Sequence, residues 1–133
     1  MVTIKQAKLN DLKGMEGREN ALGGPCFSLS ALEMFMKAPD FAVLVGGGSG
    51  AVLYHEGKGG KSRTMLLVGQ ASPDLIRAVE ASALKAGTVK VTAEIDPASP
   101  ALEAFERAGF RRGGEVANYF GKGRPAVFIE KDI

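Results

Sequence analysis

Residues 99–110 read S-P-A-L-E-A-F-E-R-A-G-F, and this stretch decides the fold. The serine at its start can cap a helix, and the proline that follows suits the first helical position, where its missing N–H is not needed. The pattern predicts a helix over residues 101–108, which Gly109 can end in a left-handed conformation. Phe110 then turns towards the core. The stretch therefore predicts a short helix that an aromatic side chain holds against a sheet.

The segments on either side of this helix have the patterns of strands. Residues 88–95 read T-V-K-V-T-A-E-I, in which apolar and polar residues alternate. Residues 112–120 and 126–131 predict two further strands, and the glycine- and proline-containing link between them predicts a hairpin. The last third of the chain is thus expected to be a strand, a helix and a hairpin.

The first two thirds of the chain predict helices, a meander of strands and a further helix. Three apolar segments with glycine-rich links, residues 41–45, 51–55 and 64–68, predict an antiparallel meander. Ser72 and Pro73 can begin the helix that follows, and Gly87 can end it. Before the meander, a strand is expected over residues 2–7, and helices over about residues 11–20 and 28–37.

This order and two motifs resemble the GNAT superfamily of N-acetyltransferases. Residues 101–110 are similar to its A-x-x-x-Y-x-x-x-G-F signature. Residues 118–128, N-Y-F-G-K-G-R-P-A-V-F, resemble the C-terminal hairpin of protein N-terminal and ribosomal-protein alanine acetyltransferases. The strand order covers nearly the whole chain, and the motifs lie within residues 91–131. The resemblance implies one α/β (α+β) domain over residues 1–133, with a mixed sheet of about six to seven strands and about four helices.

The resemblance also implies an activity. Family members transfer an acyl group, commonly from acetyl-CoA as co-substrate, to a primary amine, and the hairpin favours peptide or protein N-termini as acceptors. It further implies a V-shaped opening between the fourth and fifth strands, where main-chain groups orient the acetyl-CoA arm. The residues that the resemblance assigns to acetyl-CoA are Leu67, Val68, Gly69, Gln70, Ala71, Ser72 and Phe105.

Two departures from the family leave a second function open. The family's phosphate loop has the pattern Arg/Gln-x-x-Gly-x-Gly/Ala, whereas residues 68–74 are shorter and lack the full set of glycines. Pro73 offers no N–H, and Asp74 would repel a phosphate. Phe105 stands where many members have a proton-donating tyrosine, and Ala98 stands where an asparagine is expected. The alternative function is a non-catalytic module of this fold that binds a partner protein or a small effector.

Glu94 and Tyr119 are the candidate catalytic residues. Acyl transfer to an amine needs a base that takes the ammonium proton. Glu94 lies where N-terminal acetyltransferases carry a glutamate, although a carboxylate on the solvent face of a strand explains it equally well. Tyr119 would contact the substrate or relay a proton, and the alternative is an aromatic side chain packed in a hairpin. His55 is the one histidine, and a lone histidine is more often structural or exposed than catalytic.

Charge and composition argue against several other classes of function. The net charge of +2 does not favour nucleic acid or a membrane as a partner. Arg107, Arg111 and Arg112 could meet a phosphate, but a solvated face is the commoner meaning of such a cluster. The single Cys26 fits a reducing compartment and a cytoplasmic location, and as a nucleophile it would need His55 as its base. No His/Cys spacing predicts a metal site. A homodimer that shares edge strands is compatible with the resemblance.

Overall fold

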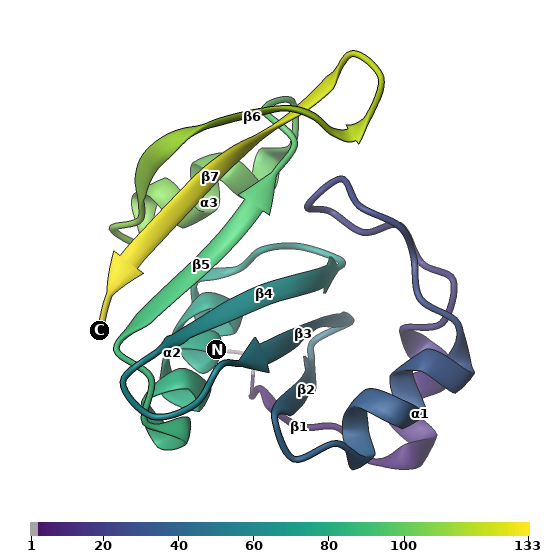
Figure 1. Cartoon of the computed structure of the whole chain (residues 1–133). Helices are drawn as coiled ribbons and strands as arrows, with labels where there is room; N and C mark the ends of the chain where they lie inside the picture. The colour runs from purple at the N-terminus through teal and green to yellow at the C-terminus, as the bar shows by residue number, and fades with distance from the viewer. Residues whose placement is uncertain (1–2) are drawn as a thin grey trace.

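The computed structural model describes residues 3–133, which form a mixed seven-stranded sheet with helices on both faces (Figure 1). The sheet order is β1-β2-β3-β4-β5-β7-β6. The strands are β1 (Lys5–Gln6), β2 (Phe41–Gly46), β3 (Ser49–His55), β4 (Lys61–Val68), β5 (Lys90–Ile95), β6 (Arg111–Gly121) and β7 (Arg124–Asp132). The helices are the 3-10 helix η1 (Leu9–Gly14), α1 (Leu29–Lys37), α2 (Pro73–Ala86) and α3 (Pro100–Arg107). The predicted fold class and element order are confirmed.

Strands β4 and β5 are paired along only part of their length. They run parallel from the pair Lys61↔Lys90 to the pair Thr64↔Ala93. Beyond these pairs β4 continues to Val68 and β5 to Ile95, and the two strands diverge (Figure 1). The divergence of the fourth and fifth strands that the resemblance implies is therefore present.

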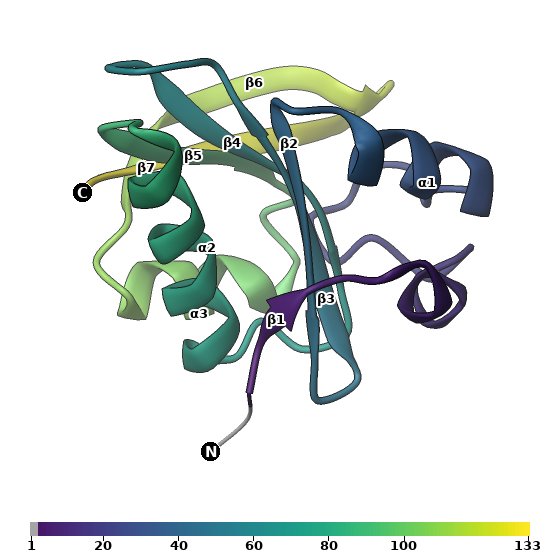
Figure 2. The same cartoon turned by 90° about the horizontal axis from the view of Figure 1, so that it is seen from below.

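The sheet separates two hydrophobic clusters. Figure 2 shows α2 and α3 on one face of the sheet and α1 on the other. Strand β4 contributes to both clusters, because successive side chains of a strand point to opposite faces. Leu67 packs in the larger cluster with α2 and α3, while Leu66 and Val68 pack in the cluster that includes Leu32 of α1. The strand at the edge of the opening is thus fixed by packing on both sides.

The helix expected over about residues 11–20 is wrong beyond Gly14. The structure has the 3-10 helix η1 at Leu9–Gly14, and of its residues only Leu12 is buried. Gly17 has a φ angle of 64°, which a right-handed helix does not accommodate. The chain then turns at residues 21–24 beside the sheet. Of the strand expected over residues 2–7, Val2 lies outside the described residues, and the structure has β1 at Lys5–Gln6.

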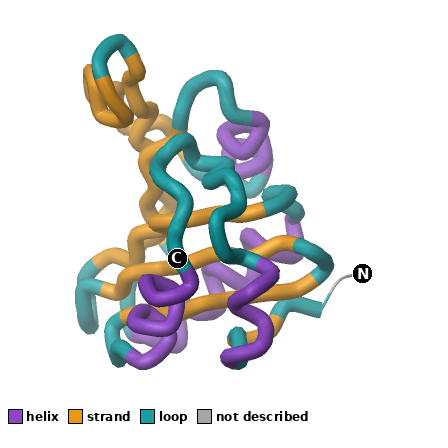
Figure 3. Tube along the Cα trace, turned by 90° about the vertical axis from the view of Figure 1, so that its right-hand side faces the viewer, coloured by secondary structure: helices purple, strands orange, loops and turns teal. Residues whose placement is uncertain are grey.

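The C-terminal hairpin of β6 and β7 extends away from the body of the molecule (Figure 3). Nearly every residue of β6 is exposed, and its register against β7 shifts between Val116 and Gly121. Asn118 lies within this irregular stretch with a φ angle of 57°, and its side-chain oxygen accepts a hydrogen bond from the Gly123 N–H at 2.8 Å. The irregular stretch carries Tyr119, so it decides where that phenol lies.

Candidate active site

Residues 20–23, called the strap here, bridge the diverging ends of β4 and β5. The Ala21 N–H donates to the Leu67 carbonyl of β4 at 2.7 Å. The Asp96 N–H, directly after β5, donates to the Leu22 carbonyl at 2.7 Å. A turn of the N-terminal region, closed by the Gly23 N–H donating to the Asn20 carbonyl at 2.9 Å, therefore lies where the two strands no longer pair. The main chain of Leu67 was expected to orient acetyl-CoA. Its carbonyl instead accepts a hydrogen bond from Ala21 of the same protein.

The side chain of Asn20 fixes the strap to β4. It is 4% exposed and makes four hydrogen bonds. Its amide nitrogen donates to the carbonyls of Met65 and Pro25, and its oxygen accepts from the N–H groups of Leu67 and Leu22. A buried main-chain N–H or carbonyl without a partner is costly. The Asn20 side chain supplies the hydrogen bonds that a neighbouring strand would otherwise give to Met65 and Leu67 of β4. The sequence did not predict a role for Asn20, because this residue was expected only to be the last residue of a helix.

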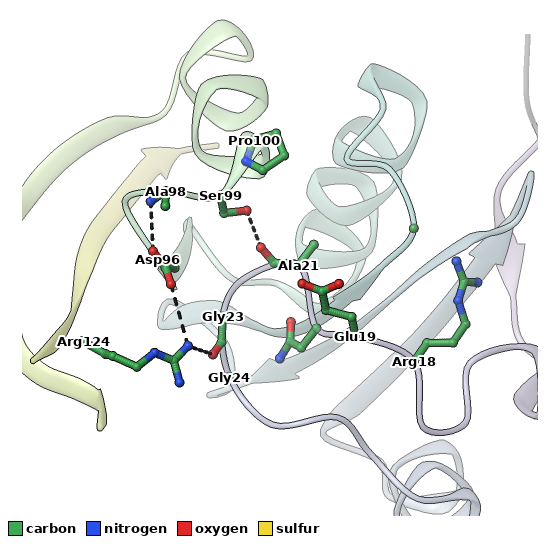
Figure 4. A pocket seen from close by; sticks show the side chains of 12 residues that line it. Arg18, Glu19, Ala21, Gly23, Gly24, Asp96, Ala98, Ser99, Pro100 and Arg124 are labelled. Atoms are coloured by element: carbon green, nitrogen blue, oxygen red, sulfur yellow. Dashed lines mark hydrogen bonds and ion pairs between the residues drawn. The ribbon is translucent and has the colours of Figure 1, made fainter. Parts of the chain in front are cut away.

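Three cavities adjoin the opening. The large cavity, of about 700 Å³, lies between the strap and the start of α3 (Figure 4). The tyrosine cavity, of about 510 Å³, is lined by residues that include Arg63, Glu94 and Tyr119. The loop cavity, of about 440 Å³, is lined by residues 69–73 and by α3. Strap residues line both the large and the tyrosine cavities, so the strap is a wall between them.

Both candidate catalytic residues meet at Arg63. The Arg63 Nε lies 3.1 Å from a carboxylate oxygen of Glu94, and its terminal nitrogen donates to the Tyr119 hydroxyl. Burial lowers the pKa of Arg63, but the negative charge of Glu94 and the hydrogen bonds to Glu94 and Tyr119 raise it overall. The guanidinium therefore stays charged and orients the carboxylate. Sequence reasoning missed Arg63, because only the pairing of β4 with β5 places it beside Glu94.

The loop expected to hold phosphate uses its own donors internally. The Gln70 N–H donates to the Ser49 hydroxyl at 3.0 Å, and the Ser72 N–H donates to the Gln70 carbonyl at 2.9 Å. The Ser72 hydroxyl caps α2 by accepting from the Leu75 N–H. Pro73, the first residue of α2, has no N–H, and the acidic Asp74 follows it in the first turn. As arranged, these groups do not fit a pyrophosphate, which needs several main-chain donors directed at it.

Phe105 lies in the core rather than at a cavity wall. Its side chain is fully buried and meets the Phe110 ring edge-on, with the ring centres 4.9 Å apart. Its assignment to acetyl-CoA stays a prediction. The basic cluster nearby is neutralised, because each arginine pairs with a carboxylate: Arg107 with Glu103, Arg111 with Glu130 and Arg112 with Glu106.

His55 belongs to a buried polar chain away from these cavities. The Thr88 hydroxyl donates to the Ala83 carbonyl, so Ser62, 2.7 Å away, is left to donate to Thr88. His55 Nδ1, 2.6 Å from the Ser62 oxygen, is then the donor to Ser62. Its Nε2 faces the Ser82 hydroxyl at 3.4 Å. Both ring nitrogens are engaged within this network, which gives His55 a structural role and no contact with the exposed Cys26.

We expect His55 to make the stability of the protein depend on pH. Burial lowers the pKa of His55 below its usual 6.5, against the opposing charge of Asp40. The unfolded chain therefore takes up this proton at a higher pH than the folded chain, and stability falls as the pH drops below about 6.5. Urea unfolding at pH 7.5 and 5.5 should show a smaller loss for His55→Asn than for the wild type. Equal losses would contradict the prediction.

Between residues 3 and 133, no helix has the length and apolar character needed to cross a membrane. Over the same residues, no three His, Cys, Asp or Glu side chains gather in a way that could hold a metal ion.

Comparison with known proteins identifies the fold. No family model and no curated protein matches the sequence. An N-acetyltransferase from Staphylococcus aureus Mu50 matches in structure with a TM-score of 0.76 and 16% identity, over 99% of this chain and 98% of that chain. The ribosomal-protein-S18-alanine N-acetyltransferase from Escherichia coli matches at 0.73 and 17%, over 100% and 94%. The spermidine N-acetyltransferase from Vibrio cholerae, in complex with CoA and spermine, matches at 0.77 and 14%, over 98% and 95%. The chain therefore has the fold of the GNAT N-acetyltransferases.

Proposed function

We propose that the protein is an N-acyltransferase that uses an acyl-CoA, acetyl-CoA in the first instance, and acts on a primary amine. The observation that carries the proposal is the divergence of β4 and β5 after the pair Thr64↔Ala93, in a chain whose fold is that of acetyltransferases. The matching structures include enzymes named for spermidine and for a ribosomal-protein alanine. An amine acceptor is common to both names. The C-terminal hairpin extends the proposal to peptide or protein N-termini.

The tyrosine cavity supports an acceptor site. Its volume of about 510 Å³ is typical of small-molecule sites. Glu94 lies in its wall with a side chain 18% exposed, so its carboxylate is partly shielded and still reachable. A carboxylate there would attract the ammonium group of an acceptor and take its proton, while Arg63 holds the carboxylate in place. Tyr119 would contact the acceptor through its exposed phenol.

The donor side supports binding of acetyl-CoA only in a weakened form. The N–H groups of Gln70 and Ser72 already have partners, and the acidic Asp74, whose carboxylate pairs with Arg77, lies at the start of α2 where phosphates would lie. We therefore expect the acyl-bearing arm to contribute more to affinity than the phosphates do. A cytoplasmic location and a homodimer sharing edge strands stay predictions.

Acetyl-CoA is expected to stabilise the protein against heat. A ligand that binds only the folded state at 100 times its dissociation constant adds about 2.7 kcal/mol to the free energy of unfolding. The measurement is the Tm over a range of acetyl-CoA up to millimolar concentration. ATP, which has phosphates but no thioester arm, is the control and should shift the Tm less. No shift at millimolar acetyl-CoA would remove the transferase proposal in its usual form.

A second candidate function is a non-catalytic module that binds a small effector or a partner protein. The hydrogen bonds of the strap to Leu67 favour it, because they occupy the edge of β4 that a donor would use. The large cavity, with Arg18 and Arg124 in its wall, would then hold the effector. The two functions differ in one assay. Release of free CoA with polyamines, aminoglycosides and short peptides supports the transferase, and a Tm shift without any release supports the module.

A further inference from the structure

We propose that the strap, residues 20–23, is a built-in competitor of the acyl donor, which binds only when the strap leaves the opening between β4 and β5. The inference rests on the proposed function, in which the main chain of Leu67 orients acetyl-CoA. In the structure the Leu67 carbonyl accepts from the Ala21 N–H, and the Leu67 N–H donates to the Asn20 side chain. The arm of a donor cannot use either group while these bonds hold.

The position of the strap also keeps the two proposed half-sites apart. The loop cavity, on the side from which the donor would enter, shares Ala21, Gly69 and Pro100 with the large cavity. The tyrosine cavity, where the acceptor would bind, shares Asn20, Gly23 and Gly24 with it. Strap residues are therefore part of the shared wall in both cases. A donor on one side therefore reaches the amine beside Glu94 only after the strap has moved.

The contacts of the strap make its closed form dominant without covalent attachment. Leu22 is 2% exposed and packs in the larger hydrophobic cluster, so opening exposes it to water. Ser99 donates from its hydroxyl to the Ala21 carbonyl, and Arg124 donates to the Gly23 carbonyl at 3.2 Å (Figure 4). Each of these contacts joins the strap to a single neighbouring residue, and none of them is part of the pairing of β4 with β5. The strap can thus open while the sheet stays folded, and the donor's apparent affinity falls in proportion to the open fraction.

Gly23 offers a way to open the strap with one methyl group. Its φ angle is 109°, and a Cβ built there would lie 2.7 Å from the Asp96 Cβ, closer than two carbons approach without a shift. Gly57 is the matched control, because its φ angle is 117° and a Cβ there would meet nothing within 4 Å. Gly23→Ala and Gly57→Ala therefore share backbone strain, and only the first pushes the strap away from β5.

The test measures the dissociation constant of acetyl-CoA by calorimetry for four proteins: the wild type, Gly23→Ala, Gly57→Ala and Asn20→Ala. We expect Gly23→Ala and Asn20→Ala to bind about tenfold more tightly than the wild type, and Gly57→Ala to bind as the wild type does. Hydrogen exchange of the unaltered protein gives a second readout that needs no variant. Saturating acetyl-CoA should speed exchange of the Ala21 amide, although ligands usually slow exchange.

The outcomes separate this inference from the function on which it rests. Equal affinities in all four proteins, with the Ala21 amide still protected in the complex, would overturn the competing strap and leave the transferase proposal standing. A different outcome is that no protein binds acetyl-CoA, although fast exchange of residues 20–23 in Gly23→Ala shows that the strap is open. That outcome would overturn the transferase proposal and the inference with it.

Discussion

Replacing Glu94 by glutamine is expected to lower the turnover number for acyl transfer by about 10²–10⁴-fold, the usual contribution of a general base. Glutamine has nearly the same shape as glutamate, and its side-chain oxygen can still accept from Arg63. It cannot take a proton from an ammonium group. The measurement is the release of free CoA at saturating acceptor between pH 6 and 9. A drop in kcat with little change in KM would show that the carboxylate acts on the reaction and not on binding.

Glu115→Gln is the matched control for this substitution. Glu115 lies on β6 at an exposed position and lines none of the three cavities described above, so its loss of charge should leave turnover unchanged. Unchanged turnover of Glu94→Gln at neutral pH would rule out Glu94 as the base. Glu94 would then have a structural role, through its ion pair with Arg63.

Replacing Phe105 by alanine is expected to cost about 3–5 kcal/mol of the free energy of unfolding, as for other fully buried aromatic residues. The ring is 0% exposed and packs edge-on against Phe110. Its removal leaves a cavity where α3 meets the sheet, and it also removes an aromatic pair. Urea unfolding followed by circular dichroism measures the loss. A change below about 1 kcal/mol would contradict the packing of this helix.

Two further variants make the Phe105 result specific. Met34→Ala removes a side chain that is 61% exposed, and we expect it to change stability by less than about 0.5 kcal/mol. Phe105→Tyr adds a hydroxyl to a fully buried ring, which should cost about 1–3 kcal/mol if the hydroxyl finds no partner. A Phe105→Tyr protein as stable as the wild type would show that the ring edge reaches a polar group. That result would make this position able to hold a proton donor.

The elements with local signals were predictable from the sequence. Ser72 accepts from the Leu75 N–H, and Ser99 accepts from the Ala101 N–H, as expected of helix caps. Gly87 ends α2 with a φ angle of 83°. Each of these signals involves residues within a few positions of one another, so the sequence contains all of the required partners.

The parts of the site that depend on distant contacts were not predictable. Glu94 could be named from the sequence, but its partner Arg63 is 31 positions away and reaches it only through the pairing of β4 with β5. Asn20 and Leu67 are 47 positions apart. Nothing near Asn20 in the sequence shows that its side chain bonds to a strand. The expected helix ended at about residue 20, so the sequence assigned no contact to the residues that fill the opening.

The short parallel pairing described above has a consequence for how the domain unfolds. Strands β1 to β4 and strands β5 to β7 are two antiparallel units. Among the described residues their strands pair only along the ladder that ends at Thr64↔Ala93, and the larger hydrophobic cluster contains residues of both units. The hydrogen bonds from residues 20–23 to Leu67 and Asp96 fasten one unit to the other. When these bonds open, the larger hydrophobic cluster still holds the two units together, so this end of the sheet loosens locally before the domain unfolds. A ligand that occupies the opening must replace these hydrogen bonds. Ligand binding and the local stability of this end of the sheet therefore depend on the same few main-chain groups.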